Sequence, residues 1–367
     1  MTERITRKLT RPVMIGDLSI GGEFPIVIQS MTNTKTTDIT STKKQVSELI
    51  AAGCEMIRLA IPDRASVTAL EKIVSYSSVP IVADIHFDDD LAIRAIENGA
   101  AKIRINPGNI GGRKKLTAIA KKADAYNVAM RVGINSGSLE KDILNKFGAV
   151  TAEALVCSAK RHQQYLEEIP FTNLVFSIKA STVYTTIKAC RLFSETSDYP
   201  LHLGITEAGP PSVGLIKSAI GIGTLLAEGI GDTIRVSLTA SPVEEVEAAR
   251  KILQALGIRS FGPELISCPT CGRCETDLQS LTAEVEKILN EYHIPVKVAV
   301  MGCAVNGPGE AREADIGISA GKKQGIIFCK GRVVRTVKTD ILLETFKQEL
   351  KIFLEMVDPD SPGGFNR

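Results

Sequence analysis

A chain of 367 residues is longer than one ordinary hydrophobic core supports, so a large domain with a smaller one is expected. Hydrophobic residues make up 44% and charged residues 23%, with a net charge of +2, which is typical of a globular protein and excludes a general nucleic-acid binder. The first 25 residues contain no apolar signal-peptide core, and no run of about eighteen apolar residues follows, so we expect a cytoplasmic protein without a membrane span.

Short β-branched apolar runs alternate with longer amphipathic stretches between residues 25 and 257, which is typical of βα units around a parallel sheet. The predicted strands are 25–30, 56–60, 80–85, 102–106, 129–134, 174–180, 201–207 and 233–238. The helices predicted between them include 41–52, 91–98, 113–126, 151–168, 213–228 and 242–256, and Asp38 and Ser241-Pro242 supply cap signals. Eight units over about 230 residues predict a (β/α)₈ TIM barrel. A doubly wound open sheet is the alternative, but no Gly-x-Gly-x-x-Gly follows the first strand.

The remainder of the chain predicts a small α+β domain after a linker over residues 257–267. Its predicted elements are a helix at 278–292, strands at 296–300 and 316–319, a hairpin at 325–337 and a helix at 340–356. We therefore divide the chain into a barrel domain (1–257), an α+β domain (258–358) and a tail (359–367). The turn residues of the tail predict disorder.

Cationic residues recur near the carboxyl ends of the predicted barrel strands, where barrels carry their chemistry. These are Arg58, Arg104, Arg131, Lys179 and Arg235, with Asn135 and Ser237 beside them. One such arginine is commonly a paired structural charge. Five in equivalent positions need an anionic partner, and guanidinium groups suit phosphate, so the inferred ligand is a polyanion, most simply a diphosphate.

Two carboxylates, Asp84 and Glu207, are predicted at the same rim, and each has two interpretations. Each carboxylate serves in one of two ways that the sequence leaves open: it neutralises neighbouring arginines, or it takes part in proton transfer. We interpret Asp84 as an orienting group and Glu207 as the better general acid, because little else near Glu207 can donate a proton. His86 is the only histidine predicted at a rim position.

Four of the eight cysteines indicate a metal centre: Cys268, Cys271 and Cys274 in one run, and Cys303 in a separate turn. Thiolates from two turns fit a structural zinc or an iron–sulfur cluster, and their spacing alone slightly favours zinc. Glu310 favours the cluster, because an oxygen ligand near Cys303 can exchange for substrate. The other cysteines, predicted to be small buried side chains, are Cys54, Cys157, Cys190 and Cys329.

Seven segments, in order over nearly the whole chain, resemble those of the 4-hydroxy-3-methylbut-2-enyl-diphosphate synthases of the non-mevalonate isoprenoid pathway. The segments are Ile28-Gln-Ser-Met-Thr-Asn33, Val82-Ala-Asp-Ile-His-Phe87, Ile103-Arg-Ile-Asn-Pro-Gly-Asn109, Arg131-Val-Gly-Ile-Asn-Ser-Gly137, Gly204-Ile-Thr-Glu-Ala-Gly209, Cys268-Pro-Thr-Cys-Gly-Arg273 and Gly302-Cys-Ala-Val-Asn-Gly-Pro-Gly-Glu310. The resemblance implies two-electron reductive opening of 2-C-methyl-D-erythritol 2,4-cyclodiphosphate to (E)-4-hydroxy-3-methylbut-2-enyl diphosphate, with loss of water.

The resemblance also implies a [4Fe-4S] cluster on Cys268, Cys271 and Cys303 with Glu310 as the fourth ligand, which makes Cys274 a bystander although spacing alone selects it. It places Glu207 and Asn306 beside the reacting carbons. It implies that the diphosphate is held by Arg58, Arg104, Arg131, Lys179 and Ser237, with Asp84 and Asn135 in support. We add Arg235 from the rim pattern.

The resemblance further implies a homodimer in which the cluster domain of one chain faces the barrel of the other, with a flavodoxin or ferredoxin as the electron donor. The acidic surface of such a donor requires a basic patch, for which the candidates are Arg312, Lys322, Lys323, Lys330 and Arg332. The rival interpretation is a non-redox barrel, such as a pterin-binding methyltransferase with structural zinc. A non-enzymatic scaffold ranks third, because charges inside barrel strands then cost stability without a function.

Overall fold

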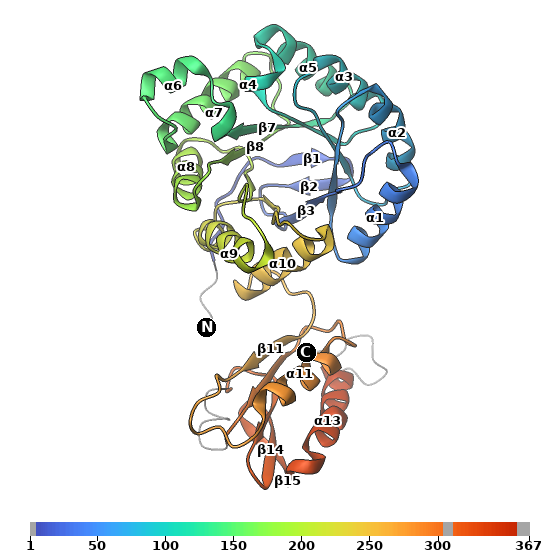
Figure 1. Cartoon of the computed structure of the whole chain (residues 1–367), viewed down its shortest axis with the longest axis vertical. Coiled ribbons are helices and arrows are strands. Elements are labelled where there is room, and N and C mark those ends of the chain that lie inside the picture. The colour runs from blue at the N-terminus through green and yellow to red at the C-terminus, as the bar shows by residue number, and fades with distance from the viewer. Residues whose placement is uncertain (1–4, 304–310, 358–367) are drawn as a thin grey trace. The chain divides into compact units, whose positions relative to one another are not determined.

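The computed structural model describes residues 5–303 and 311–357. The chain divides into two compact units between Arg259 and Ser260 (Figure 1). In the described ranges, no helix combines the length and the apolar character that crossing a bilayer requires.

The first unit is a barrel of eight parallel strands, which confirms the predicted TIM barrel. Its strands are β3 (Val27–Met31), β4 (Met56–Ala60), β5 (Ile81–Asp84), β6 (Lys102–Ile105), β7 (Ala129–Asn135), β8 (Leu174–Lys179), β9 (His202–Leu203) and β10 (Thr233–Ile234). They pair in the order β8-β7-β6-β5-β4-β3-β10-β9. A parallel bridge between Phe176 and Leu201 joins β8 to the residues that lead into β9, so the ends of the sheet meet.

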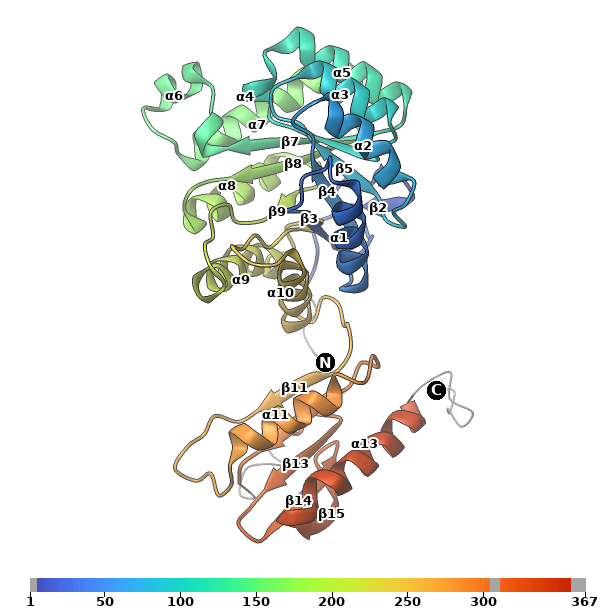
Figure 2. The ribbon, with the colours of Figure 1, turned by 45° about the vertical axis from the view of Figure 1, so that its right-hand side comes forward.

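Helices surround the strands, as the turned view shows (Figure 2). They are α1 (Ile39–Ala51), α2 (Arg64–Val74), α3 (Asp89–Glu97), α4 (Pro107–Ile110), α5 (Arg113–Ala125), α6 (Lys141–Phe147), α7 (Ala152–Glu167), α8 (Val183–Thr196), α9 (Pro211–Ala227) and α10 (Pro242–Ala255). Both predicted caps are present. Asp38 accepts a hydrogen bond from the Ser41 amide, and Ser241 forms a capping box with Glu244.

An N-terminal hairpin that the sequence pattern did not reveal packs against the barrel. Its strands are β1 (Val13–Ile15) and β2 (Leu18–Ile20). Val13, Ile15 and Ile20 form one buried cluster with side chains near the amino ends of the barrel strands, namely Val27, Met56, Val82, Ala129 and Val175. This apolar layer fills the amino end of the barrel, so the polar side chains further along the strands lie toward the carboxyl end.

The last two barrel strands are shorter than the predicted runs 201–207 and 233–238. The Arg235 amide still donates to the Leu203 carbonyl at 3.0 Å. Beyond that point the Leu238 amide donates to the Glu245 carboxylate at 2.9 Å, and so a side chain of α10 takes the place of a neighbouring strand. A strand pattern cannot signal a side-chain acceptor that lies on another element.

In its described residues the second unit contains a five-stranded sheet and two helices, which agrees with the predicted α+β domain. Its elements are β11 (Glu264–Ser267), α11 (Leu278–Leu289), β12 (Lys297–Met301), β13 (Ile316–Ala320), β14 (Gln324–Cys329), β15 (Arg332–Lys338) and α13 (Leu342–Val357). The strands pair in chain order, parallel from β11 to β13 and antiparallel from β13 to β15.

One prediction for this unit is wrong, because part of the expected linker 257–267 is strand β11. Leu265 packs against the core of the unit, and the strand pairs along its whole length with β12. Strand β11 is only four residues long and half-buried. An alternation of apolar and polar residues over so short a segment does not distinguish a strand from a linker.

Candidate active site and cysteine centre

Charged side chains from adjacent barrel strands converge because the strand register places them side by side. Asp84 on β5 pairs with Arg104 on β6, and Arg104 pairs in turn with Arg131 on β7. Asn135 at the end of β7 pairs with Lys179 at the end of β8. Residues opposite one another in a parallel sheet point to the same face, so these predicted site residues share the barrel interior.

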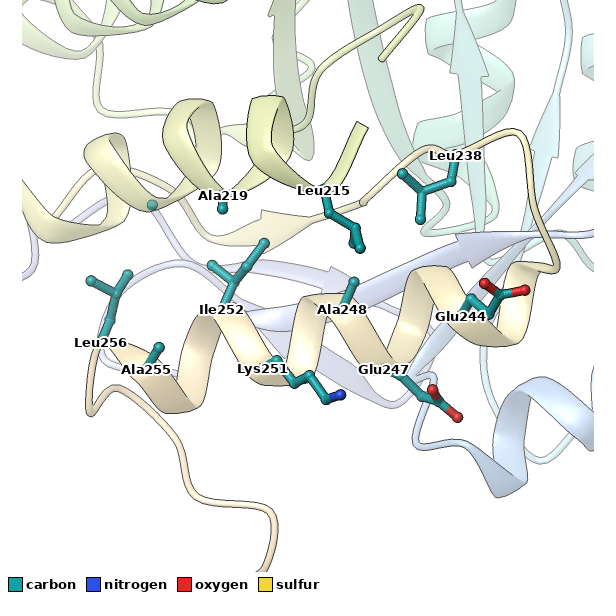
Figure 3. A pocket seen from close by; sticks show the side chains of 11 residues that line it. Leu215, Ala219, Leu238, Glu244, Glu247, Ala248, Lys251, Ile252, Ala255 and Leu256 are labelled. Carbon is teal, nitrogen blue, oxygen red and sulfur yellow. The ribbon is translucent and has the colours of Figure 1, made fainter. Parts of the chain in front are cut away.

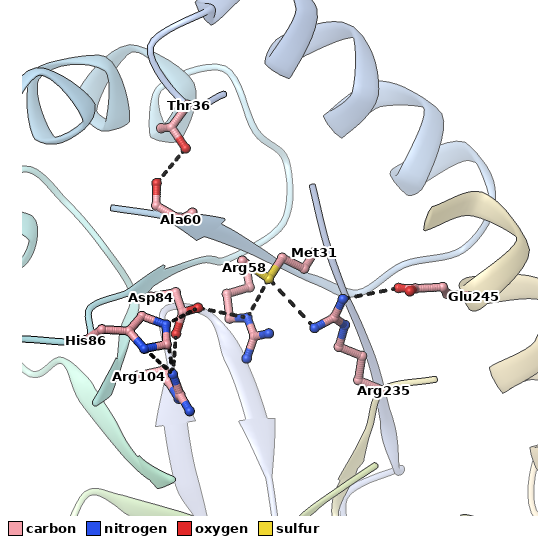
Figure 4. Close-up of polar contacts among 9 residues, drawn as sticks. All are labelled: Met31, Thr36, Arg58, Ala60, Asp84, His86, Arg104, Arg235 and Glu245. Atoms are coloured by element: carbon pink, nitrogen blue, oxygen red, sulfur yellow. Dashed lines mark hydrogen bonds and ion pairs between the residues drawn. The ribbon is translucent and has the colours of Figure 1, made fainter. Parts of the chain in front are cut away.

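Asp84 lies at the centre of this group and contacts three cationic or polar side chains (Figure 4). Its Oδ1 accepts a hydrogen bond from Arg104 Nη1 at 3.2 Å, and its Oδ2 lies 3.8 Å from Arg58 Nε. His86 Nε2 is 3.2 Å from the same Oδ2 and 3.1 Å from Arg104 Nη1. His86, the histidine predicted at the rim, therefore lies beside Asp84 and Arg104.

Electrostatics keep Asp84 ionised. Burial alone raises the pKa of this carboxyl group, but the charge of Arg58, the hydrogen bond from His86 and the charge of Arg104 together hold the pKa well below its ordinary value. Burial lowers the pKa of Arg58 to about 9, against the opposing effect of Asp84. Asp84 therefore orients the arginines and has no proton to donate at neutral pH.

Arg235 follows β10 and is held from outside the barrel by Glu245 of α10. Its Nη2 lies 3.5 Å from Glu245 Oε2, and that carboxylate also accepts a hydrogen bond from Ser30 at 3.2 Å. The Met31 sulfur lies 3.1 Å from Arg58 Nε and 3.7 Å from Arg235 Nη1, and so it bridges the two guanidinium groups (Figure 4). Sequence reasoning missed Glu245 because it looks like an ordinary acidic residue in the first turn of a helix.

The Lys179 side chain has just enough room at the rim because residue 204 is a glycine. A Cβ atom at Gly204 would lie 2.7 Å from Lys179 Nζ and 2.6 Å from the Arg235 carbonyl oxygen. Burial, followed by the charges of Arg131 and Arg58, lowers the pKa of Lys179 well below its ordinary value. Four neighbouring cations that disfavour a fifth charge are typical of a site completed by a bound anion.

The other predicted rim residues differ in how they are placed. Asn135 is the last residue of β7 and Ser237 lies three residues after β10, and both are half-buried. Glu207 is exposed and takes a left-handed backbone conformation with φ of 53°. Within the described ranges it makes no hydrogen bond or ion pair with the rim cations, so this carboxylate stands apart from the Asp84 network.

Lys102 is a functional candidate that sequence reasoning missed. It is fully buried on β6, and its Nζ is one of the buried polar atoms of the described chain without a hydrogen-bond partner. Burial, followed by the charges of Arg131 and Arg58, lowers its pKa well below the ordinary value. A signal was available, since Lys102 lies two residues before Arg104 and therefore on the same face of the strand.

Two pockets of the described barrel differ in the side chains that line them. The first is lined by the rim residues Asp84, His86 and Phe87 together with Ala60, Ile61, Pro62, Asp88 and Leu91. The second lies between α9 and α10 and is lined mainly by apolar side chains, including Leu215, Ala219, Leu238 and Ile252 (Figure 3). Only the first adjoins the charged network, so the candidate active site lies at the rim.

Cys268, Cys271, Cys274 and Cys303 lie at one end of the second unit, where the parallel strands β11 and β12 both end. Cys268 directly follows β11, and its sulfur accepts a hydrogen bond from the Gly302 amide at 3.3 Å. The carbonyl of the adjacent Cys303 accepts one from Ser319 at 2.7 Å. Hydrogen bonds with Arg273 lower the pKa of the exposed Cys271, which favours the thiolate that a metal needs.

Cys274 differs from the other three in its surroundings. Its thiol donates to the Thr276 carbonyl at 3.2 Å, and a Cβ atom at Gly302 would lie only 2.6 Å from its sulfur. It therefore packs against the Gly302 backbone, at the edge of the apolar core. Asn306 and Glu310 lie outside the described residues, and no group of three metal-binding side chains is assembled in the ranges that are described.

The four remaining cysteines differ in how deeply they are buried. Cys54 and Cys190 are buried as predicted, and burial raises the pKa of each thiol to about 12. The prediction of burial is wrong for Cys157 and Cys329, which are half-buried. None of the four lies in the two cysteine turns.

Known proteins resemble this chain over nearly its whole length. Residues 10–250 match the model of the GcpE TIM-barrel domain, and residues 264–352 match that of the GcpE protein C-terminal domain. The 4-hydroxy-3-methylbut-2-en-1-yl diphosphate synthase (flavodoxin) of Clostridium perfringens is 54% identical over 93% of this chain and 97% of its own. The enzyme of the same name from Bacillus subtilis is 50% identical over 97% of this chain and 94% of its own.

A solved dihydropteroate synthase from Stenotrophomonas maltophilia resembles the barrel, with a TM-score of 0.51 and 14% identity over 68% of this chain and 98% of its own. That likeness shows the fold alone. Both domain models match, and about half of the residues are identical to those of relatives aligned over nearly their full length. This chain therefore belongs to the GcpE family.

Proposed function

We propose that this protein reductively opens 2-C-methyl-D-erythritol 2,4-cyclodiphosphate to (E)-4-hydroxy-3-methylbut-2-enyl diphosphate. Membership of the family and the names of its full-length relatives support this activity. The observation in the structure that carries it is the excess of positive charge at the barrel rim. Among the described residues, five basic side chains lie at this rim, Arg58, Arg104, Arg131, Lys179 and Arg235, and they outnumber the two carboxylates that contact them, Asp84 and Glu245.

The substrate-binding role of the rim follows from this charge. A diphosphate supplies the missing negative charge and accepts the bidentate hydrogen bonds that guanidinium groups offer. Arg131 Nε and Arg235 Nε are both buried without a hydrogen-bond partner, so the bound ligand satisfies donors that the described protein leaves unpaired. Asn135 and Ser237 supply neutral hydrogen-bonding groups beside these charges.

The proton chemistry falls to Glu207. The reaction takes up two electrons, opens the bond from carbon to the cyclic diphosphate and releases a hydroxyl group as water, which requires a proton. Asp84 is held ionised by its arginines, so it binds and orients. Glu207 is exposed and lies outside that network, and we assign the delivery of this proton to its carboxyl group. We assign Asn306 to hydrogen bonding beside the reacting carbons.

The donor set of the second unit fits a [4Fe-4S] cluster held by Cys268, Cys271 and Cys303, with Glu310 as the fourth ligand. The thiols lie on two turns at one end of the sheet, and an amide donates to one sulfur, as is common around such clusters. When bound, the cluster supplies the two electrons one at a time. The packing of Cys274 against Gly302 supports its role as a bystander.

The proposed assembly is a cytoplasmic homodimer in which the cluster unit of one chain faces the barrel of the other, served by a flavodoxin or ferredoxin. The word flavodoxin in the names of the relatives supports the first donor. An exposed apolar face on α9 supports self-association, since Leu215, Ile216 and Ile220 remain 40%, 60% and 53% exposed.

Metal analysis of anaerobically purified protein tests the function. We expect about four irons and four sulfides per chain, retained in Cys274→Ala and labile in Glu310→Ala. The cyclic diphosphate should be converted only when a reductant is present. One zinc per chain that is lost in Cys274→Ala and indifferent to Glu310→Ala would instead support the non-redox barrel with structural zinc.

A further inference from the structure

The turn between β13 and β14 lies at the cysteine end of the second unit. Strands β11, β12 and β13 are parallel, so their carboxyl ends share one edge of the sheet. Cys268 follows the first of these strands and Cys303 follows the second, while residues 321–323 follow the third. The next turn, at residues 330–331, lies at the opposite end because β14 runs antiparallel to β13.

Hydrogen bonds connect this turn directly to the cysteine turns. The Lys322 amide donates to Glu275 Oε2 at 3.3 Å, and the Glu275 amide donates to the Gly302 carbonyl at 3.0 Å. Glu275 is the neighbour of Cys274, and Gly302 is the neighbour of Cys303 in sequence. The backbone of residues 321–323 is therefore held one side chain away from both cysteine turns.

The turn presents cations to solvent. Lys322 and Lys323 are exposed, and neither ammonium group forms an ion pair within the described ranges. Arg273 is exposed on the cysteine turn and contacts Cys271, and Lys338 is exposed opposite Gln324 at the same end of the sheet. Three carboxylates lie here as well: Glu275 is bound by the Lys322 amide, Asp277 caps α11, and Asp340 is exposed.

We propose that Lys322 and Lys323 form the docking surface for an acidic one-electron carrier that feeds the cysteine centre. This inference rests on the proposed function. Each reduced flavodoxin gives one electron and becomes its semiquinone, so two dockings complete the two-electron reduction. Electron transfer through protein weakens steeply with distance, and this end of the sheet brings the donor nearest to the thiols.

Two of the other basic candidates, Lys330 and Arg332, provide a matched control. They have the same charge and are also exposed, but they lie at the far end of β14. Five residue steps along an antiparallel strand separate the two turns by roughly 17 Å. A role of surface charge in general predicts equal effects at both turns, whereas docking beside the cysteines predicts an effect at residues 322–323 alone.

The test is anaerobic stopped-flow reduction of the purified holoenzyme by flavodoxin hydroquinone. For Lys322→Glu/Lys323→Glu we expect the second-order rate constant to fall about tenfold at low salt and its salt dependence to weaken. Lys330→Glu/Arg332→Glu should stay within about twofold of the unmodified protein. Calorimetric titration of oxidised flavodoxin into the holoenzyme measures the binding affinity. We expect weaker binding to Lys322→Glu/Lys323→Glu than to Lys330→Glu/Arg332→Glu or the unmodified protein.

Equal slowing by both double variants, or slowing by neither, would overturn the docking surface. Dithionite reduction and iron content are expected to be unchanged in every variant, and they separate this failure from a failure of the function. One outcome is an enzyme that carries iron, accepts electrons from dithionite and turns over, with a rate of reduction by flavodoxin that the charge reversal does not change. That outcome contradicts the docking surface and leaves the proposed function intact. A protein that carries zinc and accepts no electrons contradicts the proposed function and the docking together.

Discussion

The carboxylate of Asp84 and the guanidinium of Arg104 share a hydrogen bond of 3.2 Å in which both side chains are almost fully buried. The pair lies on adjacent strands at opposite register positions, so the sheet itself brings the two charges together. Asp84 thus provides the counter-charge for Arg58 and Arg104, as Glu245 does for Arg235.

We expect Asp84→Asn to lower the free energy of unfolding by about 3 kcal/mol at neutral pH, because it leaves buried arginines without their counter-ion. Chemical denaturation measures this. The lowered pKa of Asp84 means that its contribution is present above the unfolded value of about 3.9 and is lost as the pH falls further. Asp198→Asn, in the exposed pair with Arg11, is the control and should cost less than about 1 kcal/mol. Similar losses in both variants would show that Asp84 is no special counter-charge.

Lys102→Met should raise the free energy of unfolding by about 2 kcal/mol at pH 7, because it removes a buried amino group that has no hydrogen-bond partner among the described residues. The pKa of Lys102 is lowered in the folded protein, so the unfolded chain binds more protons below pH 10.5. The stability of the unmodified protein therefore rises as the pH rises toward that value, and the variant should lack this slope. Exposed Lys121→Met is the matched control, for which a change within about 0.5 kcal/mol is expected. A destabilised Lys102→Met would contradict the argument.

Gly204→Ala should raise the KM for the cyclic diphosphate about tenfold, equivalent to about 1.4 kcal/mol. The added Cβ would lie 2.6 Å from the Arg235 carbonyl oxygen and 2.7 Å from Lys179 Nζ, so the backbone at Arg235 and the Lys179 side chain must both shift. Steady-state kinetics measure the effect. Gly223→Ala on α9 has open space around the new methyl group and should leave KM unchanged while stabilising the helix by about 1 kcal/mol. An unchanged KM in Gly204→Ala would remove Lys179 from the substrate site.

Replacing Glu207 should separate stability from activity. Both Glu207→Gly and Glu207→Ala remove the proposed proton donor and should lower kcat by at least about a hundredfold. Glu207 has φ of 53°, a conformation that glycine adopts without strain, so the glycine variant should be more stable than the alanine variant by about 1 kcal/mol. Thermal unfolding and single-turnover kinetics together check the pair. Retained turnover in either variant would move the proton transfer to another group.

The order of elements was predictable because apolar periodicity is a local property. Eight β-branched runs separated by amphipathic stretches allow few other solutions, and the barrel was confirmed. The features that were missed depend on contacts between distant segments. The β1–β2 hairpin is recognisable as a plug only once the strands it packs against are assembled, and β11 became visible only through its pairing with β12.

By itself, the sequence determined the family, the fold class and the residue types of the site, since long motifs and strand periodicity are written along the chain. Tertiary structure alone decided which charges meet. The register of β5, β6 and β7 places Asp84, Arg104 and Arg131 side by side, and a helix more than two hundred residues from β3 brings Glu245 to Ser30. Burial decided the rest: Lys102 reads as an ordinary lysine in the sequence, and only a closed barrel removes it from water and lowers its pKa.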